Sequence, residues 1–277
     1  MSLLSRRDFL RLTGLTATGL VVTGQRYVGD SNRLEVTRTL IDLPGDGVPF
    51  TIALIADVHA PRVGLDFEEV VRAVNAARPD LVLIVGDAIN RRGDEGLVEM
   101  HAGMVARLGK YAVPGNWENW GRVRRRGMAR HYARADAAWL DNHVTELPDV
   151  GVRLVGLDES TNGWPDRDLL ARLPGDRPVI LLHHSPAAFD RLPFPPDSPV
   201  LMLSGHTHGG QVAPLGRALI LPPGSGGYVS GRYARGPHRL YVSRGIGNSH
   251  LPCRIGARPE VAILEVRRTG RPVGRVA

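Results

Sequence analysis

Short apolar runs alternate with an amphipathic stretch early in the chain. Residues 51–56 and 81–85 are continuous runs of mainly aliphatic side chains, the pattern of strands that are buried on both faces of a sheet. Between them, residues 66–78 repeat apolar side chains every three or four positions, which predicts an amphipathic helix that ends before Pro79. This order predicts a strand–helix–strand unit.

The rest of the chain adds helices first and short strands later. We expect a helix over residues 95–108, a strand over 111–113 and a basic helix within 122–140. Five more apolar runs predict strands, at residues 152–157, 179–182, 200–203, 240–243 and 261–266. Two packed sheets flanked by helices would accommodate both halves. Because no internal repeat or linker interrupts the pattern, we expect one domain over residues 26–277.

Composition narrows the class of protein. The chain has 277 residues, of which 43% are hydrophobic and 23% are charged. These percentages are ordinary for a globular protein and exclude a wholly disordered chain. The single cysteine, Cys253, excludes an intramolecular disulfide and a thiolate-rich zinc site, so any metal must be held by oxygen and nitrogen. The net charge of +7 is compatible with a nucleic acid or an anionic membrane as partner. No aromatic–basic platform accompanies the charge, so we expect no nucleic-acid partner.

Residues 1–25 have the pattern of a targeting signal. Arg6 and Arg7 precede a short, weakly apolar run at residues 12–22, which is typical of a twin-arginine export signal. A helix of that length, at about 1.5 Å per residue, cannot cross a hydrocarbon core of about 30 Å. We therefore expect the twin-arginine export machinery as a partner, and a location in the periplasm or on the outer face of the cytoplasmic membrane. A short amphipathic helix docked on the domain is the alternative.

Side chains that bind metals follow five of the predicted strands, at the point where each strand ends. They are Asp57 with His59, Asp87, Asn116, His183 with His184, and His206 with His208. Ligands gather at the carboxyl ends of strands in α/β sheets, so we expect these side chains to meet. Each motif alone is also typical of a turn, a core histidine or a flexible loop. Together, the mixed oxygen and nitrogen donors favour two borderline divalent ions about 3.5–4 Å apart, with the Asp87 carboxylate between them.

The order of these motifs, D-x-H, G-D, G-N, H-x-P and G-H-x-H, resembles that of the calcineurin-like metallophosphoesterases. The resemblance spans residues 52–266 and is nearest to an exported branch with Gly-His-Thr-His-Gly-Gly-Gln, here residues 205–211. That branch also shares the Arg-Tyr pair at 232–233 and the Tyr-Val-Ser-Arg-Gly-Ile-Gly stretch at 241–247. The resemblance implies an α/β fold: a four-layer α/β/β/α sandwich of two mixed β-sheets flanked by helices.

The resemblance also implies an activity and a ligand set. The activity is hydrolysis of a phosphodiester or diphosphate bond by a hydroxide that bridges two divalent ions, Mn, Fe or Zn. Matched motif by motif, the resemblance implies one set of ligands for each ion, with the Asp87 carboxylate bridging the two ions. The first set is Asp57, His59 and His208, and the second is Asn116, His184 and His206.

One position departs from the family pattern. The family's Gly-Asn-His motif has a histidine beside the scissile phosphate, and this chain has Trp117 there. An indole cannot deliver a proton, and general acid catalysis typically contributes about 10²–10⁴-fold. A substrate with a poor leaving group would suffer most from this change. His183, or a water held by Glu118, is a candidate substitute. Together with Asp87, which bridges the two ions, His183 and Glu118 are our candidate catalytic residues.

Several substrates and two other functions stay open. We expect an active hydrolase for a phosphodiester or a nucleotide-linked diphosphate such as UDP-diacylglucosamine, although that lipid precursor is made on the cytoplasmic face and export argues against it. A lipid-linked substrate and contact with a membrane surface are compatible with the arginines at 122–130 and with an apolar wall of Trp117, Trp120 and Trp164. A solvated helix face and a buried core are the plainer interpretations. The other functions are a catalytically impaired metal-binding scaffold of the same fold and a basic nucleic-acid-binding protein.

Overall fold

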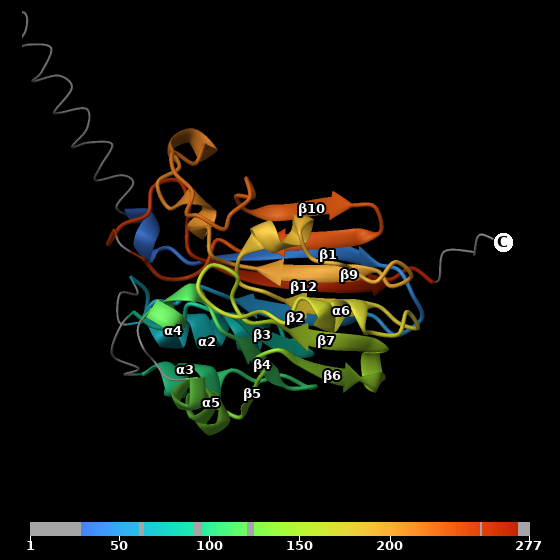
Figure 1. The fold of residues 1–277 in the computed structure, drawn as a ribbon. Coiled ribbons are helices and arrows are strands. Elements are labelled where there is room, and N and C mark those ends of the chain that lie inside the picture. Colours follow the sequence, from blue (N-terminus) through green and yellow to red (C-terminus); the bar gives the residue numbers. More distant parts are fainter. Residues whose placement is uncertain (1–28, 61–63, 91–95, 121–124, 250, 271–277) are drawn as a thin grey trace, which may run out of the picture.

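Two six-stranded sheets stack face to face, and helices cover their outer faces (Figure 1). The computed structural model describes residues 29–60, 64–90, 96–120, 125–249 and 251–270. The predicted export signal, with Arg6 and Arg7, lies outside these ranges. The layers are helices, first sheet, second sheet and helices, so the predicted four-layer sandwich is confirmed.

The first sheet has the strand order β1-β12-β2-β3-β4-β5. Strands β2 to β5 run parallel, whereas β12 is antiparallel to β2 and parallel to β1. The strands are β1 (Glu35–Leu43), β2 (Phe50–Ile55), β3 (Leu81–Val85), β4 (Lys110–Val113), β5 (Ala137–Trp139) and β12 (Glu260–Arg268). The outer face of this sheet packs against α2 (Phe67–Ala76), α3 (Leu97–Gly103) and α5 (Arg125–Arg134), and α4 (Asn116–Trp120) follows β4.

The second sheet has the order β10-β11-β9-β8-β7-β6. Its four inner strands are parallel and its two edge strands are antiparallel to their neighbours. The strands are β6 (His143–Leu147), β7 (Val152–Gly156), β8 (Val179–Leu182), β9 (Val200–Ser204), β10 (Gly231–Arg235) and β11 (His238–Val242). Its outer face packs against α6 (Asp168–Ala171) and the 3₁₀ helix η3 (Pro186–Asp190). Four more 3₁₀ helices are η1 (Gly29–Asn32), η2 (Pro148–Val150), η4 (His208–Gly210) and η5 (Pro214–Gly216).

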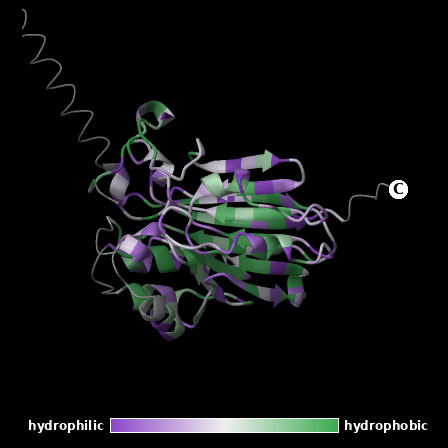
Figure 2. Ribbon diagram, viewed as in Figure 1, coloured by the Kyte–Doolittle hydropathy of each residue, from purple (hydrophilic) through white to green (hydrophobic). Residues whose placement is uncertain are grey.

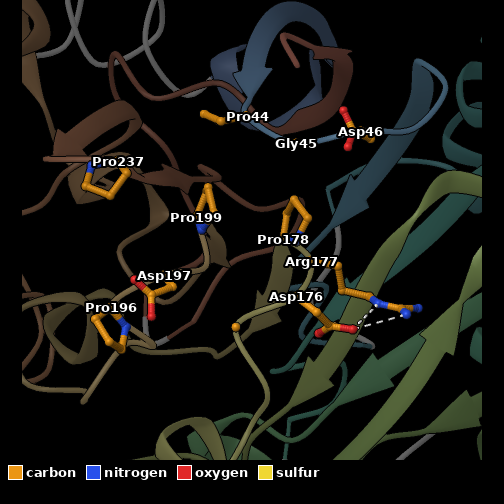
Figure 3. Close-up of a pocket in the computed structure, with 11 residues that line it drawn as sticks. Pro44, Gly45, Asp46, Asp176, Arg177, Pro178, Pro196, Asp197, Pro199 and Pro237 are labelled. Carbon is orange, nitrogen blue, oxygen red and sulfur yellow. Dashed lines mark hydrogen bonds and ion pairs between the residues drawn. The ribbon is translucent and has the colours of Figure 1, made fainter. Parts of the chain in front are cut away.

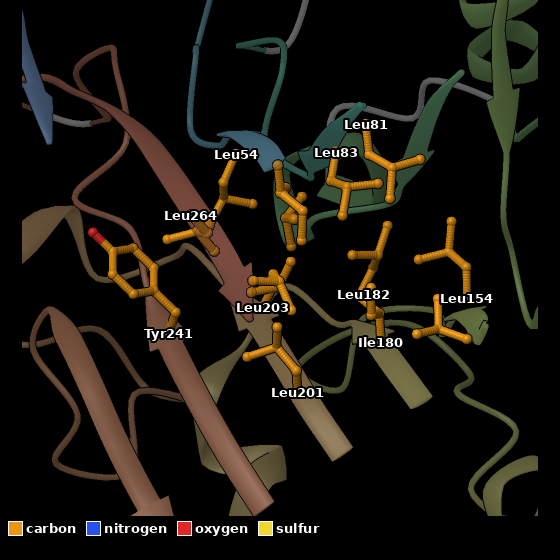
Figure 4. Packing of buried hydrophobic residues seen from close by; sticks show 14 of the residues in the cluster. Leu54, Leu81, Leu83, Leu154, Ile180, Leu182, Leu201, Leu203, Tyr241 and Leu264 are labelled. Carbon is orange, nitrogen blue, oxygen red and sulfur yellow. The ribbon is translucent and has the colours of Figure 1, made fainter. Parts of the chain in front are cut away.

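The main core lies between the two sheets. Leu54 and Leu83 of the first sheet face Leu182 and Leu203 of the second, and all four are fully buried (Figure 4). The alternate side chains of β2, such as Ile55, face the helices and are equally buried. Burial on both faces explains why the inner strands read as continuous apolar runs. In Figure 2 the hydrophobic residues accordingly concentrate in the strands at the centre of the sandwich.

The structure differs from the expected elements mainly at the edges. The helix expected at 95–108 is shorter, α3, and the basic segment expected as one helix within 122–140 contains α5 followed by the short strand β5. Strands β1, β6 and β10 were not predicted; they lie at sheet edges, where many side chains are exposed and apolar runs are absent. Within the described ranges, no helix is both long and apolar enough to span a bilayer.

Shortening one side chain between the sheets tests the packing. Leu203→Ala removes a fully buried side chain, so we expect the free energy of unfolding to fall by about 2–5 kcal/mol, measured by urea denaturation. Leu40→Ala, on the edge strand β1 with the side chain 44% exposed, is the control and should cost less than about 1 kcal/mol. Equal losses for the two variants would contradict a core at this interface.

Candidate metal centre

The predicted ligands meet at one end of the sandwich, where α2 and α4 are labelled in Figure 1. They follow the carboxyl ends of β2, β3 and β4 in one sheet and of β8 and β9 in the other. Their side chains form two groups, and within each group one ligand atom per residue lies within 4.8 Å of the others. One group is Asp57, His59 and His208, and the other is Asp87, His184 and His206, all of them buried.

Asp87 lies between the two groups. Its Oδ2 atom is 3.1 Å from Nε2 of His184 in its own group and 3.6 Å from Nε2 of His59 in the other. Asn116 joins the second group, with its Oδ1 atom 2.9 Å from Nδ1 of His206. The structure therefore brings together all seven side chains that the sequence predicted as ligands.

The hydrogen bonds of His184 and His206 leave one lone pair of each ring facing the centre. Nδ1 of His184 lies 2.8 Å from the carbonyl oxygen of Val85, which can only accept, so the proton is on Nδ1. Nε2 of His184 faces Oδ2 of Asp87 at 3.1 Å, and it carries a proton when the ring is charged and offers a lone pair when the ring binds a metal. In the same way, Nε2 of His206 donates to the carbonyl of Pro223 at 2.8 Å, and its Nδ1 lone pair faces the Asn116 amide oxygen. A cation satisfies these facing lone pairs.

Two outer partners orient the other histidines. Nδ1 of His59 is 3.1 Å from Oδ1 of Asn90, so the ring donates there and its Nε2 accepts. Nδ1 of His208 is 3.1 Å from Nη2 of Arg254, and a guanidinium can only donate. The proton of a neutral His208 ring is then on Nε2, 3.0 Å from Nε2 of His59. A divalent ion held by these two rings would replace that proton, so the donor set fits a metal.

Burial and close charges shift the pKa values of the ligands. Burial raises the pKa of Asp57 to about 7. Burial also favours a higher pKa for Asp87, but His184 and His59 outweigh it and lower the pKa to about 2. Burial disfavours a charged His184, yet Asp87 and Asp57 raise its pKa well above the usual value. Without metal, the centre therefore holds protons on Asp57 and His184 in place of cations.

Five of the seven ligands have a left-handed backbone. They are Asp57, His59, Asp87, His206 and His208, with φ between +52° and +74°. Aspartate and histidine adopt this conformation more readily than branched residues, but each instance still costs free energy and persists only where the surroundings enforce it. Close packing enforces it here: a Cβ on Gly205 would lie 2.5 Å from Oδ2 of Asp57. The strand ends thus turn sharply enough to aim consecutive motifs at one point.

The two other candidate catalytic residues, Glu118 and His183, face other protein groups instead of the cavity. The Glu118 carboxylate accepts hydrogen bonds from the backbone N–H groups of Asp87, Ala88 and Gly115 at 2.7–3.0 Å. His183 is fully buried, with Nδ1 3.1 Å from the carbonyl of Ser185 and Nε2 2.7 Å from Oγ of Ser160. Neither side chain lines the cavity over the ligands. The geometry does not support proton donation by either one, because both are occupied in holding the ligand loops.

Two contributors were missed from the sequence. Asn90 and Arg254 orient His59 and His208, but they stand apart from the motifs that carry the ligands. Asn90 offered a weak signal, because it follows the Gly86-Asp87 motif by three residues in an otherwise apolar stretch. Arg254 offered none, since a buried arginine cannot be told from an exposed one in a loop. It is fully buried and donates to the carbonyls of Gly247, Arg244 and Ala257 as well.

A cavity of about 500 Å³ opens over the ligands. Asp87, Asn116, His206 and His208 line it on one side. Its other walls are mostly apolar and include Trp117, Trp120, Val212, Leu219, Ile220, Pro222, Pro223 and Leu251. The expected apolar wall therefore contains Trp117 and Trp120 but not Trp164, which is 78% exposed and does not line the cavity. A mainly apolar cleft with convergent polar groups is typical of a small-molecule site.

A second cavity, of about 490 Å³, lies at the other end of the strands (Figure 3). Pro178, Pro199 and Pro237 line it, and each precedes the first residue of an inner strand of the second sheet. Asp176 and Arg177 in its wall pair with one another, and no group of potential metal ligands was found there among the described residues. Because ligands bind at the carboxyl ends of parallel strands, we place the functional site in the other cavity.

Known proteins resemble this chain in sequence. Residues 50–210 match the family described as calcineurin-like phosphoesterase. The metallophosphoesterase YkuE of Bacillus subtilis is 30% identical over 97% of this chain and all of its own length, and the phosphodiesterase YaeI of Escherichia coli is 27% identical over 95% and 100%. A bovine transmembrane protein with a metallophosphoesterase domain is 30% identical, and the match covers 91% of this chain and 60% of that protein. The chain belongs to the calcineurin-like phosphoesterase family.

Proposed function

We propose that this metal-dependent phosphoester hydrolase is a phosphodiesterase that works with two divalent ions, Mn, Fe or Zn, at the described centre. The observation that carries the proposal is the place of Asp87, within 3.6 Å of ligand atoms in both groups. Family membership supports the class of reaction, and the relative named as a phosphodiesterase supports the diester. A diphosphate is the second candidate substrate, since its leaving group is also a weak base.

Each group would hold one ion. Asp57, His59 and His208 would bind the first, Asn116, His184 and His206 the second, and the Asp87 carboxylate would contact both. When bound, such a pair of ions neutralises phosphoryl oxygens and lowers the pKa of water toward neutrality. The chain's own part is to fix this geometry: the backbone N–H of Trp117 donates to Oδ1 of Asp87 at 2.8 Å and leaves Oδ2 directed at the histidines.

The cavity walls indicate the kind of ester. The Trp117 indole lies edge-on to the His59 ring, with ring centroids 5.4 Å apart, where the family pattern has a histidine. It therefore adds apolar surface beside the ligands and no proton donor. We propose a lipid-linked ester whose apolar part binds these walls and whose leaving group is a weak base that needs little protonation.

The location of the enzyme is part of the proposal. We propose that residues 1–25 are a twin-arginine export signal and that the domain acts in the periplasm or on the outer face of the cytoplasmic membrane. The paired Arg6 and Arg7 support the export signal, and the bovine relative that is named as a transmembrane protein supports contact with a membrane. An apolar cavity over the ligands is also suited to a lipid and not to a nucleic acid.

Replacing Asp87 tests the metal centre. Asp87→Ala should abolish hydrolysis of bis(p-nitrophenyl) phosphate, and elemental analysis should show fewer than the two ions per chain expected for the native protein. Loss of a residue that only orients a metal ligand typically lowers activity by up to about 10²-fold. Because Asp87 is proposed to contact both ions itself, its loss should lower the rate by more than that. Asp149→Ala, at an exposed position in η2, is the control. Native protein that holds two ions but turns nothing over would favour the scaffold function instead.

Metal affinity should rise with pH. Asp57, with a pKa of about 7, and His184, with a raised pKa, hold protons that a metal must displace, whereas His59, with a pKa lowered to about 4, is already neutral. Binding at about pH 6 should therefore release protons, and the apparent affinity for Mn²⁺ should increase toward about pH 8. Calorimetric titration in buffers of different ionisation enthalpy measures both effects. An affinity that stays constant or falls over this range would contradict the proton assignment.

Restoring the family histidine tests the substrate bias. Trp117→His should accelerate hydrolysis of a diester with a poor alkyl leaving group, by up to about 10²–10⁴-fold, because a general acid is regained. The rate for bis(p-nitrophenyl) phosphate should change much less, since its leaving group needs no proton. The ratio of the two kcat/KM values is the measurement, and Trp117→Phe is the control that keeps the position apolar. A parallel change for both substrates would show that Trp117 does not set the bias.

A further inference from the structure

Large aliphatic side chains gather, unburied, around the opening of the cavity. The segment 211–223, called here the mouth loop, exposes 92% of Leu215, 65% of Leu219 and 81% of Ile220. Leu251 and Trp120, on the same cavity wall, are 52% and 54% exposed. Leu215 also has a φ of +55°, a conformation that a bulky residue adopts only under constraint. Exposed large apolar side chains grouped beside a cavity are typical of an interaction surface.

The mouth loop lies next to the place where the N-terminal segment joins the domain. Ser31 accepts a hydrogen bond from the backbone N–H of Arg254 at 2.6 Å, and Asp30 pairs with Arg258 at 3.3 Å. The mouth loop also contacts the segment 254–258, because the N–H of Ala213 donates to the carbonyl oxygen of Ile255 at 2.7 Å. Figure 1 shows η1 and the loops that follow β9 at one end of the sandwich. Residue 29, where the described part of the chain begins, therefore lies close to the mouth loop.

The mouth loop carries a positive charge and no negative one. Its single charged residue is Arg217. Arg217 is exposed within the mouth loop, among its aliphatic side chains. Aliphatic side chains mixed with arginine, without acidic residues, suit the boundary of an anionic bilayer, where apolar groups enter the acyl region and cations stay among the headgroups.

We propose that the mouth loop, together with Leu251 and Trp120, docks the domain on an anionic lipid bilayer with the cavity opening toward the lipid. The inference rests on the proposed function for the lipid character of the substrate, and it adds the surface and the orientation. The mouth end faces the membrane, and the end that carries Val48 and Val105 faces water. A lipid-linked ester could then reach the ligands from the bilayer without its alkyl chain crossing water.

Probes at two ends of the full-length protein test the orientation. In a Cys253→Ser background, Leu215→Cys and Val105→Cys are each labelled with an environment-sensitive fluorophore; both native side chains are exposed, 92% and 66%. On vesicles of phosphatidylcholine with phosphatidylglycerol, the label at position 215 should shift its emission to the blue and be quenched by nitroxide-labelled lipids. The label at position 105 should do neither. On phosphatidylcholine alone, both changes at position 215 should be smaller.

A second set of variants measures binding. Leu215→Ser, Leu219→Ser and Ile220→Ser combined should weaken vesicle binding of the full chain at least about tenfold, whereas Val48→Ser with Val105→Ser should leave it unchanged. The proposal is overturned if vesicle-bound protein keeps the label at position 215 in water, or if that label becomes shielded without lipid because a second copy or another protein covers the loop. Neither measurement requires turnover, so a failed phosphodiesterase assay and a failed docking test remain separate results.

Discussion

The Asp87 carboxylate is the contact on which the rest of the centre depends. It lies between two groups of imidazoles and carboxylates, within 3.1 Å of His184 and 3.6 Å of His59. All of these side chains are buried, so their charges must be balanced locally, and burial without a counter-charge would be expensive. In the metal-free state protons on Asp57 and His184 provide that balance. Divalent cations would provide it better, since they also match the lone pairs that the outer hydrogen bonds leave free.

The sandwich supplies the rigidity that this arrangement requires. Each ligand follows an inner strand that is buried on both faces, so the start of its loop is held in place by the core. Five ligands are nevertheless held in left-handed conformations, a cost that the packing of the two sheets must offset. Glu118 contributes by binding three backbone N–H groups around Asp87 and Gly115, which joins the loops after β3 and β4. In this structure the Glu118 carboxylate therefore fixes the geometry of these two loops.

The surroundings of the ligands are apolar where the family pattern has a polar group. Trp117 replaces a histidine, and Trp120, Leu219 and Ile220 continue the apolar wall to the surface. The same change removes a proton donor and adds a binding surface. In the proposed function the first effect favours a leaving group that is a weak base, and the second favours an ester with an apolar substituent. This wall is continuous with the exposed mouth loop, so the proposed lipid substrate and the proposed contact with a bilayer involve one connected surface.

Local pattern was enough to predict the inner strands, α2 and the seven side chains that converge at the candidate centre, because apolar runs and strand-end motifs lie within a few residues of one another. It did not reveal β1, β6 and β10, whose side chains alternate with solvent at sheet edges, or Asn90 and Arg254, which reach their histidines from 31 and 46 residues away. It also could not show that Glu118 and His183 face backbone groups instead of the cavity, because a side chain's direction depends on which groups lie opposite it. The sequence alone determined the donor atoms. Only the stacking of two sheets decided which of them face a common point, since that depends on contacts between distant segments.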